Sequence, residues 1–145
     1  MISVLDTTAF SAAMRHEPGL KEYLRSRPPG EVAIVPPVVA EIEYGIQRIV
    51  ASSRKRTLLE AERDRFLGIL KILPWTAESS RQFGSIKGGL ERDGGLIDDF
   101  DIAIAAIAMS HDARVLTANL AHFNRISGLS CAHWDEGATA PRPLT

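Results

Sequence analysis

Short hydrophobic runs alternate along this chain with longer segments whose hydrophobic residues recur at helical spacing. Residues 2–5, 32–35 and 114–116 are apolar runs without polar alternation, which is typical of strands buried on both faces. Weaker signals predict a short strand or turn at 72–75 and an edge strand at 129–132. Helices are predicted over about 9–15, 20–27, 36–50, 55–70, 76–92 and 99–110. Strands interleaved with helices predict an α/β fold with a largely parallel sheet.

Capping residues and hydrophobic stripes predict how the helices begin and which side they bury. Thr7 or Thr8 is expected to cap the first helix, and Asp98 or Asp99 the helix that ends near residue 110. The stripes expected to face the core are Ile42, Ile46 and Ile49 in one helix and Leu58, Leu59, Phe66, Leu67 and Leu70 in the next. Residues 137–145 contain two prolines and no core pattern, which predicts a loose C-terminal tail.

Composition bounds the class of protein. The 145 residues suit one domain, and 45% hydrophobic with 24% charged residues is ordinary for a packed globular chain. Lys plus Arg is 17 and Asp plus Glu is 18, so net charge alone would not hold the chain on nucleic acid. Cys131 is the single cysteine, which excludes an intrachain disulfide and a multi-cysteine zinc site. With no signal peptide or membrane span in view, we expect a soluble cytoplasmic protein.

Polar residues follow the predicted strands where a parallel sheet collects its ligands. Asp6 comes directly after the first strand, and Thr117 and Asn119 follow the strand at 114–116. Glu41 and Asp101 lie near the starts of helices that would pack at the same edge. Carboxylate and amide oxygens converging there would suit Mg²⁺ or Mn²⁺, which can activate water for phosphodiester cleavage.

Each of these residues also has an ordinary structural explanation. Asp6 could be a turn or N-cap residue, Glu41 a solvated first-turn glutamate, and Asn119 a turn former. The histidines lack the spacing of a zinc site. The basic group Arg54–Arg56, with Arg63 and Arg65, would contact phosphates or, more simply, form a solvated helix face.

Four blocks of this sequence, in order, resemble the PIN-domain ribonucleases. MISVLDTTAF resembles the first strand with its metal aspartate at Asp6, and VVAEIEYGI the second block with Glu41 and Gly45. DIAIAAIAMSHDARVLTANLAHF resembles the third block, and SGLSCAHW resembles the closing strand. The resemblance covers residues 1–134, which we take as a PIN-like domain followed by a loose tail at 135–145. The short chain is most similar to the VapC-type toxins of toxin–antitoxin pairs.

The resemblance implies a three-layer α/β/α fold with a mostly parallel central sheet, and an Mg²⁺- or Mn²⁺-dependent endoribonuclease. It implies that Asp6 and Asp101 are the main metal ligands and that Glu41 is a further ligand or orients the attacking water. Thr117 and Asn119 would support the metal shell and the bound phosphate. The implied partners are an RNA substrate, a VapB-type antitoxin and a second copy of the chain.

Two positions depart from the common pattern of the family. Thr8 stands where many members have asparagine, and its hydroxyl is expected to bond the Asp6 carboxylate. Asn119 stands where some members have a fourth acid. Because asparagine carries no negative charge, this departure would favour a single metal ion. Glu43 should point away from Glu41, because two residues span about 200° of a helix. A DNA nuclease or phosphatase with the same acids, and a binding module without catalysis, remain alternatives.

Overall fold

A five-stranded, all-parallel sheet forms the centre of the computed structural model, which describes residues 1–139. Its strand order is β3-β2-β1-β4-β5. The strands are β1 (Ser3–Leu5), β2 (Val32–Ile34), β3 (Lys71–Ile72), β4 (Arg114–Leu116) and β5 (Cys131–Ala132). β1 lies in the middle, where Val4 pairs with Ala33 on one side and Val115 on the other. Both predictions of sheet character, α/β class and parallel pairing, are confirmed.

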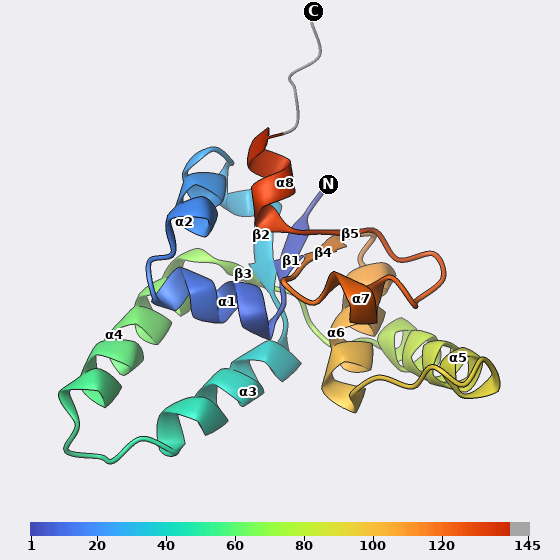
Figure 1. Ribbon diagram of the computed structural model, residues 1–145, viewed down its shortest axis with the longest axis horizontal. Helices are drawn as coiled ribbons and strands as arrows, with labels where there is room; N and C mark the ends of the chain where they lie inside the picture. The colour runs from blue at the N-terminus through green and yellow to red at the C-terminus, as the bar shows by residue number, and fades with distance from the viewer. Residues whose placement is uncertain (140–145) are drawn as a thin grey trace, which may run out of the picture.

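Helices cover both sides of the sheet, as the three-layer prediction requires (Figure 1). The connections from β1 to β3 carry α1 (Thr7–Met14), α2 (Pro18–Arg25), α3 (Pro36–Gln47) and α4 (Arg54–Ile69). A single 3₁₀ turn, Pro29–Glu31, precedes β2. The connections from β3 to β5 carry α5 (Ala77–Arg92), α6 (Asp99–Ser110) and α7 (Leu120–Phe123) on the other side.

The core lies between these layers and is built from the predicted strands and stripes. Every residue of α6 from Ile102 to Ala108 is buried, because alternating Ile and Ala side chains let this helix lie close to β4 and α5. Phe66 of α4 is also buried and packs edge-on against the ring of Phe10, their centroids 5.7 Å apart. Ile42 and Ile46 are buried as expected, whereas Ile49 is only half-buried.

Two local predictions are wrong, and one helix was missed. Neither Thr7 nor Thr8 caps the first helix; Asp6 does, because its side chain accepts the backbone N–H of Ala9. Leu58 was expected to face the core but is 57% exposed. The short helix α7 was not foreseen, since four residues are too few to show a helical period.

The segment predicted to be a loose tail begins as a helix. Trp134–Thr139 form α8, which packs against α2 near the top of Figure 1. Trp134 is buried, and its indole N–H donates to Glu17 at 2.6 Å. The rest of the predicted tail, 140–145, lies outside the described residues. Within residues 1–139, no helix combines the length and the apolar character that crossing a membrane requires.

Candidate active site

Asp6 is the most deeply buried acid at the carboxyl edge of the sheet. It follows β1, and Thr117 follows the neighbouring strand β4. The Thr117 hydroxyl donates to one carboxylate oxygen of Asp6 at 2.5 Å, while the Thr8 hydroxyl and the Ala9 amide donate to the other at 2.6 and 2.9 Å. The bond from Thr8, expected from the sequence, is therefore present. Burial nevertheless raises the pKa of Asp6 above its ordinary value, although these three donors oppose the change.

The two threonines also fix the loop that carries Asn119. The Thr8 hydroxyl accepts the Ala118 amide at 2.9 Å, and the Thr117 hydroxyl accepts the Asn119 amide at 2.8 Å. Asn119 is the N-cap residue of α7, but its own side chain makes no capping bond and is exposed. Its amide is therefore available to a ligand at this edge.

Glu41 reaches the same edge from the first half of α3. The Thr7 hydroxyl, next to Asp6, donates to its Oε1 at 2.6 Å. Glu43, two residues further along α3, accepts two bonds from Arg63 at 3.0 and 3.1 Å instead. The helical spacing thus separates the two glutamates, as predicted.

Asp101 comes from the first turn of α6, where three aspartates compete for different partners. Asp98 caps the helix by accepting the Phe100 amide at 2.8 Å, and Asp99 pairs with Lys87 at 3.0 Å. Asp101 faces the other acids, with one carboxylate oxygen 3.4 Å from Nδ1 of His122. Asp98, one of the two residues expected to cap this helix, is thus the cap.

The electrostatics of Asp101 link it to the other acids. Burial raises the pKa of its carboxyl, the hydrogen bond with His122 opposes this, and the negative charges of Asp6, Asp98 and Glu41 raise it further. Within residues 1–139, however, no three acid, imidazole or thiol groups lie close enough to form a ready-made metal centre. The predicted acids lie at one edge of the sheet and act on one another electrostatically. They are not close enough together to form a metal centre without a change in their positions.

Sequence reasoning missed two members of this edge. His122 was set aside because it matched no zinc spacing, yet it is the neighbour of Asp101 across 21 residues. Asp98 was considered only as a cap, which it is, but its charge also acts on Asp101. No short-range signal would have found the His122 contact, because it depends on α7 packing beside α6.

The basic residues of α4 are mostly engaged within the protein. Arg56 bonds the side chains of Glu60 and Gln47, Arg63 pairs with Glu43, and Arg65 pairs with Glu62. For these three arginines the ordinary explanation of a helix face is the correct one. Lys55 differs, because no carboxylate within the described part of the chain lies at ion-pair distance from it.

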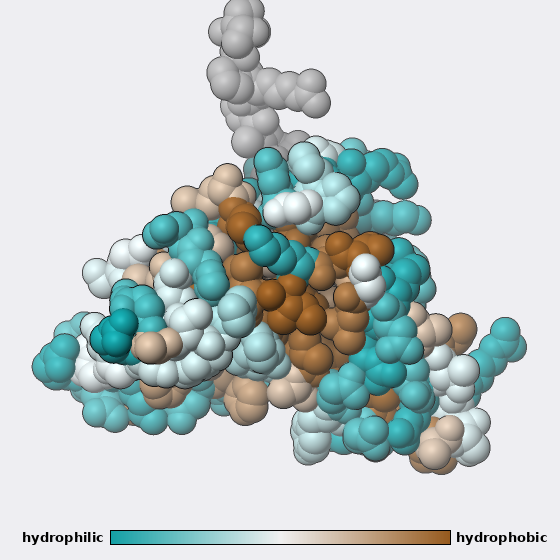
Figure 2. All heavy atoms as spheres, turned by 180° about the vertical axis from the view of Figure 1, so that it is seen from behind, coloured by the Kyte–Doolittle hydropathy of each residue, from teal (hydrophilic) through white to brown (hydrophobic). Residues whose placement is uncertain are grey.

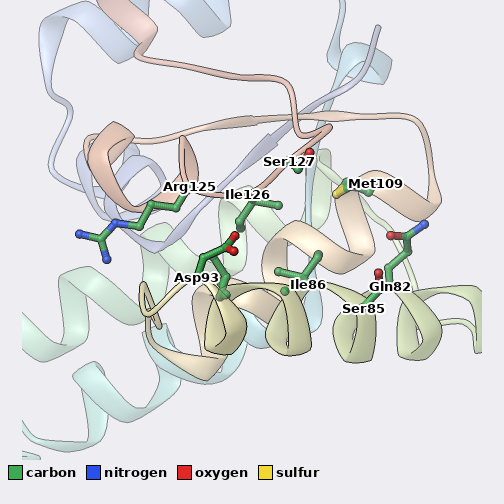
Figure 3. A pocket seen from close by; sticks show the side chains of 10 residues that line it. Gln82, Ser85, Ile86, Asp93, Met109, Arg125, Ile126 and Ser127 are labelled. Carbon is green, nitrogen blue, oxygen red and sulfur yellow. The ribbon is translucent and has the colours of Figure 1, made fainter.

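A separate cavity of about 120 Å³ lies between α5, α6 and the segment after α7. Ile86, Met109 and Ile126 line it, and the Arg125 guanidinium extends away from the other side chains (Figure 3). None of the predicted site residues lines this cavity. It is distinct from the acidic edge, and we assign no function to it.

The fold is that of a known class. The family model described as "PIN domain" matches residues 3–129. The Rickettsia felis protein "Ribonuclease VapC2" is 31% identical over 105 residues, which cover 72% of this chain and 75% of the relative. The Salmonella typhimurium "tRNA(fMet)-specific endonuclease VapC" is 27% identical over 134 residues, covering 90% and 96%.

A solved structure agrees with these relatives. The crystal structure of VapBC2 from Rickettsia felis, bound to a DNA fragment from its promoter, contains a chain that superposes with a TM-score of 0.80. The two are 29% identical, and the match covers 93% of this chain and all of the other. The chain belongs to the PIN domain family and, within it, to the VapC ribonucleases, the toxins of toxin–antitoxin pairs.

Proposed function

We propose that this chain is a divalent-metal-dependent endoribonuclease and that it acts as the toxin of a VapBC-type pair. The carrying observation is that Asp6, Glu41 and Asp101, from three separate elements, lie near one edge of the sheet, where the charges of Asp6 and Glu41 act on Asp101. Such edges are where parallel α/β sheets bind their ligands. The named activities of the relatives, ribonuclease and endonuclease, support hydrolysis of RNA phosphodiesters.

The donor set at this edge fits a hard divalent cation. Its members are carboxylates, the ligands that Mg²⁺ and Mn²⁺ prefer. The raised pKa values of Asp6 and Asp101 reflect buried negative charge, which a cation would offset. Asp6 and Asp101 would hold the ion, with Glu41 beside it. When bound, Mg²⁺ or Mn²⁺ would lower the pKa of water and neutralise charge on the phosphate.

The residues of the chain would then divide the remaining work. Thr8 and Thr117 hold the Asp6 carboxylate in one orientation by donating a hydrogen bond to each of its oxygens. Glu41, fixed by Thr7 at Oε1, would accept the proton of the attacking water. The water oxygen would bond to phosphorus, the bond from phosphorus to the leaving ribose oxygen would break, and that oxygen would take up a proton from solvent water. The exposed Asn119 amide would bind a phosphate oxygen.

Cleavage of a quenched-fluorophore RNA by purified, antitoxin-free protein tests this proposal. Asp101→Asn and Asp6→Asn should each lower the rate by about two orders of magnitude or more, and EDTA should abolish it. Asparagine remains a good N-cap, so Asp6→Asn should still fold. DNA and a small phosphoester serve as parallel substrates. Activity in either variant equal to that of the wild type would refute the proposal.

A matched pair of variants on α3 separates catalysis from general charge effects. Glu41→Gln should lower kcat by roughly 100-fold or more, because it removes the proposed proton acceptor. Glu43→Gln removes the same charge two residues away, where Arg63 already binds the carboxylate. It should leave kcat within a few-fold of the wild type. Equal losses in the two variants would contradict the role of Glu41.

For the antitoxin we propose a surface on α4 and the turn before it. The large apolar residues Leu20 and Tyr23 of α2 are buried and cannot contribute to it. Val50, Leu58 and Ile69 are each more than half exposed and remain to be covered. The similar structure from Rickettsia felis is a VapBC2 complex, which supports such a partner. Leu58→Asp should weaken antitoxin binding without changing cleavage by free toxin.

A second copy of the chain is the proposed occupant of another apolar hollow, of about 380 Å³. It lies between the start of α3, the segment after β3 and the start of α6. Trp75 and Phe100, 43% and 44% exposed, line it together with small apolar residues. Light scattering of the wild type and Phe100→Glu would test this: a dimer is expected for the first and a monomer for the second.

A further inference from the structure

A groove of about 440 Å³ leads from the candidate site along α1, α3 and α4, three helices that lie together in Figure 1. Thr7 and Glu41 stand at its site end. Its floor is aliphatic, with Ile42, Ile46 and Leu59 among the lining residues. The groove therefore begins at the proposed catalytic residues and continues well beyond them.

Three cations line this groove without a carboxylate partner. These cations are Arg15, Arg48 and Lys55, which form no ion pair within residues 1–139. Arg63 and Arg65, further along α4, are both paired. Unpaired cations collected in one hollow offer a polyanion its binding energy without first breaking an ion pair. Because the site itself is acidic, such cations would also offset its repulsion of phosphates.

An aromatic ring stands exposed among these cations. Tyr44 is 66% exposed, lines the groove, and has the Arg48 guanidinium 5.6 Å from its ring centroid. The next residue, Gly45, is a glycine inside a helix, where it costs stability. A Cβ at Gly45 would meet nothing within 4 Å and would project into open space. The α3 helix thus presents a flat ring beside space that a larger residue would fill.

Arg15 extends the charged path to the other side of α1. Thr7, Ser11 and Arg15 are spaced i, i+4 and i+8, so they share one face of the helix. All three line both the groove and a second hollow of about 410 Å³ that reaches Thr8, Ala118 and Trp134. Arg15 therefore stands between two hollows that both open at the candidate site.

We propose that single-stranded RNA lies in this groove, with its phosphates on Arg15, Arg48 and Lys55 and a base stacked on Tyr44. The inference deepens the proposed function and rests on it. Charge complementarity favours RNA, since the unpaired charges of the groove beyond Glu41 are all positive. Stacking on an exposed aromatic beside arginine is how sequence-tolerant single-strand binding works.

The stacking part is tested by two substitutions at one position, with binding of a fluorescent single-stranded RNA followed by anisotropy in metal-free buffer. Tyr44→Phe keeps the ring and should bind like the wild type. Tyr44→Leu keeps apolar area but loses the ring face, so its affinity should fall by about tenfold or more. An exposed side chain can be changed in this way without unfolding the chain, which circular dichroism would verify. Equal affinities of Tyr44→Leu and wild type would overturn the stacking contact.

The charge part is tested by a matched pair on α4. Lys55→Gln should reduce the slope of log affinity against log salt by about 0.7, the value for one phosphate contact on a single strand. Arg54→Gln removes the same charge from the neighbouring residue, which does not line the groove, and should leave the slope unchanged. Arg15→Gln should act like Lys55→Gln. Identical slopes in all three variants would overturn the proposal.

Failure of this inference is distinguishable from failure of the proposed function. If the wild type cleaves RNA and the Tyr44→Leu and Lys55→Gln variants bind RNA as the wild type does, the ribonuclease assignment stands. The groove is then not part of the RNA path. Loss of antitoxin binding in these variants, with RNA binding unchanged, would assign the groove to the antitoxin instead and overturn the RNA proposal. Weaker RNA binding in both, with unchanged folding, supports it.

Discussion

At the scale of single residues, the candidate site depends on hydroxyl groups that hold a buried acid. Asp6 is 1% exposed, yet each of its carboxylate oxygens accepts a hydrogen bond from a threonine hydroxyl. Burying a charge is costly unless hydrogen bonds replace its water shell. Thr117 has a second task, since its oxygen also accepts the Asn119 amide. One side chain thus positions both the acid and the loop.

Thr117→Val should therefore destabilise the protein by about 1–3 kcal/mol, because valine is similar in shape but leaves the buried Asp6 carboxylate oxygen and the partly buried Asn119 amide without this partner. Chemical denaturation followed by circular dichroism would measure the change in unfolding free energy. Thr57→Val, on the exposed side of α4, is the control and should change it by less than about 0.5 kcal/mol. A Thr117 variant as stable as the control would mean that the hydroxyl does not support Asp6.

The chemistry of this edge was predictable where it follows directly from strand ends. Asp6 and Thr117 come after strands that any apolar run would reveal, and the register that pairs Leu5 with Leu116 brings them together. His122 could not be foreseen, because its contact with Asp101 arises from the packing of a four-residue helix. The roles of the five predicted site residues stay predictions until activity is measured.

At the scale of elements, long periodic segments were predictable and their junctions were not. The apolar runs of β1, β2 and β4 and the stripes of α3 and α4 carry their own signal. Caps depend on which of several polar neighbours turns inward, so Asp6 took the place expected of Thr7 or Thr8. The helix α8 is too short to show a hydrophobic stripe, and the buried Trp134 helps to attach it to α2.

Glu17 joins these two helices and makes their contact sensitive to pH. Its carboxylate caps α2 by accepting the Gly19 and Leu20 amides, and it accepts the Trp134 indole N–H. The Gly19 bond is the main cause that lowers the pKa of Glu17 below its ordinary value of 4.5; the Trp134 and Leu20 bonds and the charge of His133 add to it, against burial. A lowered pKa in the folded state means that this stabilisation is present above about pH 4.5 and is lost as the pH falls below it.

Glu17→Gln should accordingly be less stable than the wild type at pH 6–8, with a difference that stays constant across that range. The difference should shrink as the pH falls below about 4.5, because the wild-type carboxylate then becomes protonated. Unfolding free energies from urea denaturation at pH 3.5, 4.5, 6 and 7.5 would measure it. Glu31→Gln, on the exposed turn before β2, is a control expected to show no such trend. A difference that grew toward acid pH would contradict the assignment.

At the scale of the whole molecule, the three layers leave two kinds of surface beside the same edge. On the face seen in Figure 2, hydrophobic side chains gather near the middle while polar side chains dominate the two ends. Around the acidic edge lie the cationic groove and the apolar hollow between α3 and α6. Substrate, antitoxin and a second copy would thus all bind near the acidic edge. The acids there repel one another unless a bound cation neutralises their charge.

That repulsion predicts that removing one of these acids stabilises the metal-free protein but weakens its binding of the cation. In EDTA, Asp101→Asn should melt at a higher temperature than the wild type, because it removes a carboxylate whose pKa is raised by burial and by the negative charges of Asp6, Asp98 and Glu41. Mn²⁺ should stabilise the wild type by about 2.7 kcal/mol at a hundredfold excess over its Kd, and the variant far less. Asp93→Asn, exposed at the end of α5, should respond to Mn²⁺ as the wild type does. A variant that loses stability in EDTA and still gains it fully from Mn²⁺ would show that Asp101 serves the fold rather than the cation, and the metal would then have to be sought elsewhere along this edge.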